Sequence, residues 1–156
     1  MNKIFVIIAL LLFSSNLVAS EFGGVPNPKE ILGFWKMVPL NKPEINRINP
    51  WPQPYQWFAF YDDGSFVSMA KTEGQTLTAK DLKKLFSPVK LNSPRYSWKN
   101  NYLIVEYKNM PGKYEIWGIN IFRKDSRISK KGDIIMSLAD GKTMKPIYFR
   151  HLTPIK

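Results

Sequence analysis

Cysteine is absent from this 156-residue chain, and histidine occurs once, at His151. Without cysteine there can be no disulfide bond, no cysteine nucleophile and no lipid attached through a cysteine. Zinc sites built from cysteine and histidine are excluded as well. No serine lies in a nucleophile-elbow motif that His151 could serve. Because His151 alternates with Arg150 on a terminal strand, we interpret it as a structural or surface residue. No glycine-rich phosphate loop or calcium-loop spacing is present, and we therefore expect no metal and no cofactor.

Long hydrophobic runs are also scarce. The longest is Ile4–Phe13, ten apolar residues that follow Lys3 and precede the small residues Ala19 and Ser20. A helix needs about 20 apolar residues to cross a bilayer, so this segment has the build of a secretory signal peptide. We expect a signal peptide at residues 1–20 and a periplasmic or secreted product; an uncleaved N-terminal anchor is the alternative.

Acidic residues are outnumbered: 12 Asp and Glu stand against 23 Lys and Arg, for a net charge of +11. The lysines are spread along the chain, with short doublets at Lys83-Lys84 and Lys130-Lys131. Two interpretations remain open, a solvated basic face or attraction to an anionic envelope component. Because an exported protein rarely meets nucleic acid, we expect no nucleic-acid partner. Residues 21–156 are long enough for one domain, which we expect to be monomeric with no membrane span.

Strand-like runs dominate the mature chain, and turn residues separate them. Consecutive hairpins of this kind predict an all-β fold, an eight-stranded antiparallel up-and-down barrel. Closure of the barrel would remove exposed edge strands. The eight expected strands are residues 33–38, 55–61, 65–71, 95–99, 102–108, 114–124, 133–138 and 146–152.

The hairpin within Tyr55–Lys71 carries the clearest turn signal, Asp63-Gly64. With these two residues at the centre of the turn, Phe60 would pair with Val67. Both faces of the hairpin are then apolar. One face would pack in the interior, and the other needs a cover.

A proline-rich segment, Pro39–Pro54, contains five prolines in sixteen residues. Proline at this density excludes both helix and central strand. Trp51 supplies apolar surface within it, so we interpret the segment as an ordered flap that could cover the second face of the hairpin.

One helix is expected, over Thr78–Phe86, between the third and fourth strands. Thr78 can cap its N-terminus with Asp81 three residues on, and Ser87-Pro88 should end it. An apolar stripe runs along one face, formed by Leu82, Leu85 and Phe86. The helix could cover one end of the barrel or lie on a membrane surface.

The residues Gly33-Phe34-Trp35 at the start of the first strand resemble the Gly-x-Trp signature of the lipocalins and their bacterial lipocalin-like relatives (calycins). The resemblance implies that Gly33 and Trp35 anchor one end of the barrel and that a long first loop, here Pro39–Pro54, partly closes the other. It also implies that a late arginine packs across Trp35. Arg150 is the best match for that arginine, and Arg123 is the second.

A lipocalin-like barrel suggests a protein that binds a ligand and is not an enzyme. The expected ligand is a small apolar or amphipathic molecule, with a basic rim that favours an anionic head. We expect Trp51 and Tyr55 at the mouth of the cavity and Trp57 and Trp117 on its walls. An interior filled by its own side chains is the alternative.

Two other functions remain open. The protein could be an interaction module with a packed core that docks an acidic envelope protein or glycan through a basic or aromatic face. An enzyme would need paired carboxylates, for which Glu106 and Glu115 are the candidates. In one strand register these two residues face each other, and in the other Glu115 faces Lys108.

Overall fold

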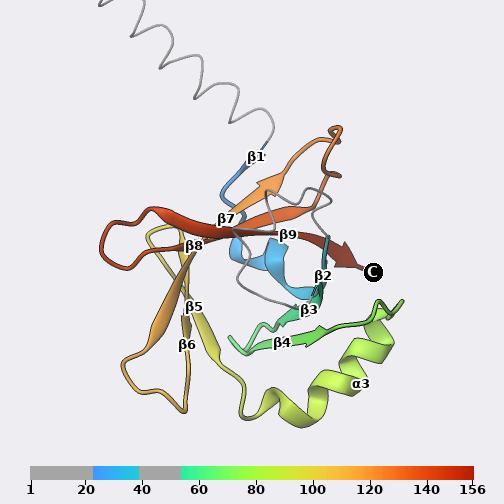
Figure 1. The fold of residues 1–156 in the computed structure, drawn as a ribbon, viewed down its shortest axis with the longest axis horizontal. Helices are drawn as coiled ribbons and strands as arrows, with labels where there is room; N and C mark the ends of the chain where they lie inside the picture. Colours follow the sequence, from blue (N-terminus) through green and yellow to red (C-terminus); the bar gives the residue numbers. More distant parts are fainter. Residues whose placement is uncertain (1–22, 39–53) are drawn as a thin grey trace, which may run out of the picture.

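The computed structural model describes residues 23–38 and 54–156, which form a mostly β structure (Figure 1). The predicted signal peptide and nearly all of the predicted flap lie outside these residues. Two helical elements occur in the described part, the 3-10 helix η1 (Pro28–Ile31) and the α-helix α3 (Ala79–Lys90). The strands there are β1 (Gly23–Gly24), β2 (Gly33–Met37), β3 (Tyr55–Phe60), β4 (Phe66–Lys71), β5 (Arg95–Lys99), β6 (Tyr102–Glu106), β7 (Tyr114–Phe122), β8 (Ile134–Ala139) and β9 (Pro146–Ile155).

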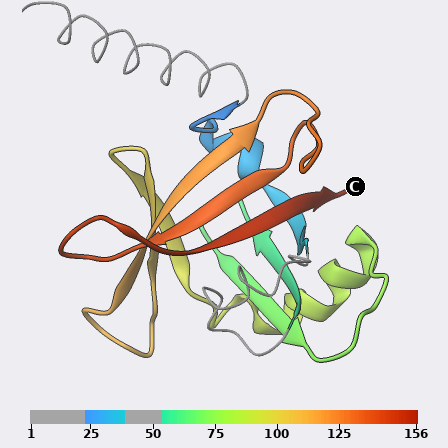
Figure 2. The ribbon, with the colours of Figure 1, turned by 45° about the horizontal axis from the view of Figure 1, so that its top comes forward.

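Strands β2 to β9 correspond to the eight expected strands and are antiparallel. Their order in the sheet is β4-β3-β2-β9-β8-β7-β6-β5, so the first and last long strands are hydrogen-bonded neighbours. The two-residue strand β1 pairs with β7. The sheet curls through 235° into a half-barrel (Figure 2). The prediction of a closed barrel is therefore wrong, and the opening lies between β4 and β5.

This seam between β4 and β5 is bridged at one end only, where Ser65 pairs with Arg95. The backbone N–H of Phe66 donates to the carbonyl of Pro94 at 2.9 Å, which is the last such bond along β4. Further antiparallel pairing would need the residues before Pro94 to be extended. Those residues instead belong to α3 and the turn that follows it, and Pro94 itself has no N–H to donate. The helix sits between the third and fourth of the expected strands, as predicted, and its position leaves the barrel open.

The β3–β4 hairpin forms with a register one residue away from the predicted one. Phe60 pairs with Phe66, where the sequence predicted Val67. The turn contains three residues, closed by a hydrogen bond from the N–H of Tyr61 to the carbonyl of Ser65. Gly64 adopts φ +79°, the left-handed conformation that ends such a three-residue loop.

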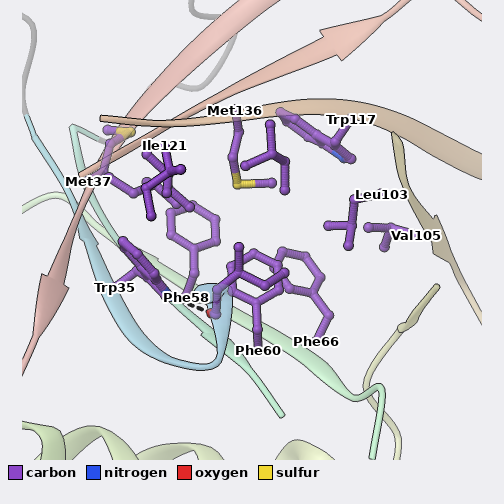
Figure 3. Close-up of a cluster of buried hydrophobic side chains, with 14 of the residues drawn as sticks. Trp35, Met37, Phe58, Phe60, Phe66, Leu103, Val105, Trp117, Ile121 and Met136 are labelled. Carbon is purple, nitrogen blue, oxygen red and sulfur yellow. Dashed lines mark hydrogen bonds between the residues drawn. The ribbon is translucent and has the colours of Figure 1, made fainter. Parts of the chain in front are cut away.

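The interior of the half-barrel is filled by aromatic and aliphatic side chains from seven of the long strands and η1 (Figure 3). Trp35 is 2% exposed, as the resemblance implied, and its indole N–H donates to the carbonyl of Ile31 at 2.8 Å. The members of this interior cluster are Ile31, Trp35, Met37, Phe58, Phe60, Phe66, Leu103, Val105, Trp117, Ile119, Ile121, Ile134, Met136, Tyr148 and Leu152.

A second cluster lies on the outer face of the sheet, where α3 packs beside β4 (Figure 1). Leu82 and Phe86 of the helix are buried against Trp57 of β3, whereas Leu85 stays 43% exposed. The helix thus covers the second apolar face of the hairpin and uses two thirds of its apolar stripe to do so. Leu82 and Phe86 are consequently not available to a membrane surface.

The N-terminus of α3 is capped as predicted: the Thr78 side chain accepts from the N–H of Asp81, and Asp81 reciprocates. The predicted end at Ser87-Pro88 is wrong, because the helix continues through Pro88 to Lys90. Proline removes one backbone hydrogen bond there, in the last turn, while the Ser87 hydroxyl donates to the carbonyl of Lys83 at 2.6 Å. Within residues 23–38 and 54–156, no helix is both long and apolar enough to span a membrane.

Candidate functional site: a buried arginine in the half-barrel

Of the four residues predicted to line a ligand cavity, the three that the structure describes do not come together. Trp117 lies in the interior, whereas Trp57 lies on the outer face beneath α3. Tyr55 is half-buried beside the same outer cluster, and Trp51 falls outside the described residues. Alternation along β3 explains the split, because Phe58 points inward and its neighbour Trp57 must then point outward.

Arg150 and Trp117, by contrast, meet in the interior. Arg150 is only 6% exposed, and its guanidinium carbon lies 4.9 Å from the centre of the Trp117 ring. The rings of Phe58 and Tyr148 follow at 5.1 and 5.5 Å. Cation–π contacts of this kind contribute on the order of 0.5–2 kcal/mol each, and more where water is excluded.

The resemblance placed the arginine across Trp35, but Trp35 and Trp117 lie at opposite sides of the interior cluster (Figure 3). Strand register gives the reason. Arg150 pairs with Met136 on β8, whereas Trp35 pairs with Pro154, four residues further along β9. Arg123, the second candidate, forms an ion pair with Glu30 at the surface.

Glu115 adds a carboxylate to this region. The indole N–H of Trp117 donates to its Oε2 at 2.8 Å, and the Tyr107 hydroxyl is a second hydrogen-bond partner. Burial raises the pKa of Tyr107, and the negative charge of Glu115 raises it further. Tyr107 therefore stays protonated and can donate. We refer to Arg150, Glu115, Tyr107, Trp117 and Tyr148 as the Arg150 cluster.

Burial also lowers the pKa of the Arg150 guanidinium, whereas Tyr148, Glu115 and Tyr107 act in the opposite direction. A guanidinium nevertheless remains a cation at neutral pH, because its ordinary pKa lies far above that range. The Arg150 cluster thus holds a permanent positive charge inside an aromatic enclosure.

A cavity of about 90 Å³ adjoins the Arg150 cluster. It reaches the open seam, because Ser68 and Ala70 of β4 contribute to its wall and are exposed. Since a water molecule occupies about 30 Å³ in the liquid, the space corresponds to about three waters. Its walls are formed by Gln56, Phe58, Phe66, Ser68, Met69, Ala70, Tyr107, Glu115 and Arg150.

Neither predicted register for the carboxylate pair is formed. Glu115 pairs with Val105, and Glu106 pairs with Tyr114. The two glutamates therefore point to opposite faces of the sheet, and no carboxylate pair results. No group of three potential metal-ligating carboxylate or histidine side chains occurs within the described ranges either. His151 is buried, with its Nε2 2.8 Å from Oδ2 of Asp133, which agrees with a structural role.

Sequence reasoning named Arg150 and Trp117 but missed Tyr107 and gave Glu115 a different role. One available signal was the spacing of Glu115 and Trp117. Two residues apart on a strand, these side chains must share a face.

Comparisons with protein-family models, with curated protein sequences and with solved structures find no match to this chain.

Proposed function

We propose that this protein is an exported, non-enzymatic, lipocalin-like binding protein for a small amphipathic molecule with an anionic head. The single observation that carries the proposal is the position of Arg150. Its charged group is almost completely buried and stands at the wall of a cavity that reaches the open seam.

Burying a guanidinium costs free energy that a bound anion would offset. Glu115 interacts electrostatically with Arg150, and its carboxylate also accepts hydrogen bonds from Trp117 and Tyr107. A guanidinium has five N–H donors in a planar fork, more than a single acceptor can use. A carboxylate or phosphate head of a ligand would match that fork.

The cavity volume limits what can enter. About 90 Å³ holds a head group but not a complete lipid or pigment. The apolar part of the ligand would therefore extend along the seam, where Met69 and Phe66 of β4 contribute to the same wall. This arrangement favours molecules with a short or flexible tail over rigid polycyclic ligands.

Isothermal titration calorimetry with decanoate and with decanol tests the proposal on the mature protein. Decanoate should bind and decanol should bind at least tenfold more weakly, because charge-assisted hydrogen bonds contribute about 1.5–3 kcal/mol. Arg150→Met should remove the preference, whereas Arg123→Met, which changes a surface arginine, should retain it. Equal affinity for the two probes, or unchanged preference in Arg150→Met, would contradict the proposal.

A further inference from the structure

Two cavities adjoin each other on the outer face of the sheet, opposite to the Arg150 cluster. One has a volume of about 500 Å³ and lies over β5, β6 and β7; the other, about 380 Å³, lies over β6, β7 and β8. They share Asn100, Tyr102 and Met144, so together they form one groove. Each volume falls within the range of roughly 300–1,000 Å³ that is typical of small-molecule sites.

Gly118 lines this outer groove without a side chain and pairs with Tyr102 across β6 and β7. A Cβ atom at Gly118 would lie 2.8 Å from the hydroxyl of Ser137 and 3.8 Å from the Tyr102 ring. The missing side chain leaves room beside the Tyr102 ring on this face of the sheet. Tyr114, at the start of β7, adds a second ring to the groove and is 58% exposed.

Two of the polar residues that line the groove, Asn100 and Asn101, lie in a tight turn. Asn100 and Asn101 have φ values of 50° and 67°, as a two-residue β-hairpin turn with two left-handed residues requires. Asparagine tolerates this conformation, and Asn100 lines both cavities.

Met144, which lines both cavities, has an unusual backbone conformation for a non-glycine residue. Its φ is 56°, in a region that costs a non-glycine residue about 1–2 kcal/mol. The loop holds it there through a bond from its N–H to the Asp140 carbonyl at 2.8 Å, while Asp140 Oδ1 accepts from the N–H of Thr143 at 2.7 Å. The side chain remains 41% exposed. Strain that places an apolar side chain at the surface is typical of a functional position.

The charged residues that line the groove are balanced, which bears on the class of ligand that it could bind. Its walls carry one lysine, Lys99, and one glutamate, Glu106, although the whole chain has a net charge of +11. A polyanion would therefore find a better match elsewhere on the surface. The exposed ring of Tyr114 and the partly buried ring of Tyr102, together with lining serine and asparagine residues, instead fit a neutral, hydroxyl-rich molecule. The C–H faces of such a molecule would pack on the rings while its hydroxyls bond to the polar groups.

We propose that this outer groove binds a neutral oligosaccharide chain. The proposal does not depend on the Arg150 cluster, because the two sites occupy opposite faces of the sheet and share no residue.

The test is calorimetric titration of the mature protein with cellohexaose, maltohexaose, chitohexaose and, as the polyanion, heparin. At least one neutral hexasaccharide should bind with an affinity that salt does not change. Tyr114→Ala should weaken it about tenfold, as loss of an aromatic contact predicts. Asn100→Gly, which keeps the turn geometry, should weaken it as well. Leu91→Ala removes an exposed side chain outside the groove and should leave the affinity unchanged.

Met144→Asn separates binding from folding. Asparagine tolerates the left-handed conformation, so the thermal midpoint should stay the same or rise while saccharide affinity falls. The proposal is overturned if no neutral hexasaccharide binds, if heparin alone binds, or if Tyr114→Ala and Asn100→Gly bind as well as the unmodified protein.

Discussion

The packing of α3 on the outer face of the sheet leads us to predict how substitutions in the helix change the free energy of unfolding. Phe86 is 2% exposed within the cluster that contains Trp57 and Leu82, and its ring centre lies 6.3 Å from that of Phe34. Replacing a buried phenylalanine by alanine removes apolar contacts and leaves a cavity. We expect Phe86→Ala to lower the free energy of unfolding by about 3–5 kcal/mol.

Leu85→Ala is the matched control, because Leu85 belongs to the same helix and the same apolar stripe but is 43% exposed. The substitution should change the free energy of unfolding by no more than about 0.5 kcal/mol, since Leu85 is not among the residues that pack on the buried outer cluster. Urea denaturation followed by circular dichroism measures both. With a slope of about 2 kcal/mol per molar, Phe86→Ala should lower the midpoint by about 1.5–2.5 M.

A loss this large could leave Phe86→Ala unfolded, because small domains are stable by only about 5–15 kcal/mol. Phe86→Leu keeps most of the apolar volume and should show a smaller loss, about 1 kcal/mol, that is still measurable. Equal effects at positions 85 and 86 would refute the packing described here and would free the helix for another surface.

Two further predictions concern a turn and the response to acid. Gly64→Ala should lower the free energy of unfolding by about 1–2 kcal/mol, because φ is +79° there and a Cβ would lie 3.1 Å from the Tyr96 carbonyl oxygen. Gly141→Ala, with open space around it, should have little effect in the same thermal denaturation assay. The Lys90 ammonium 2.9 Å away and the N–H of Ser65 hold the pKa of Asp63 well below its usual range. The stabilisation is therefore present above the ordinary pKa of about 4 and is lost as the pH falls below it, so Asp63→Asn should flatten the fall of the thermal midpoint between about pH 5 and 2. An unchanged acid profile in Asp63→Asn would show that this ion pair contributes nothing.

Local sequence signals were sufficient for much of the fold. The turn signals and apolar runs placed the strands, the Thr78 cap placed the start of α3, and Gly33-Phe34-Trp35 identified the buried anchor Trp35. Each of these features depends on residues close together in the chain, which is why the sequence could predict them.

The open seam and the division of aromatic residues between two faces depend on longer-range geometry. A three-residue turn at Asp63 is as compatible with the sequence as a two-residue one, yet it shifts every pair in the β3–β4 hairpin. Whether β4 meets β5 depends on where α3 ends, and the helix passes Pro88. The partner of Arg150 likewise follows from the β8–β9 register, which no local signal specifies.

Amide hydrogen exchange along β4 tests the half-barrel most directly. The Phe66 N–H points toward β5 and is bonded to Pro94, so the alternate amides of Ser68 and Ala70 point the same way, where the described part of the chain provides no strand. We expect slow exchange at Phe66 and at Met69, which faces β3, and fast exchange at Ser68 and Ala70. Exchange at Ser68 and Ala70 as slow as at Met69 would show a closed barrel and would contradict the account of both the seam and the cavity that opens into it.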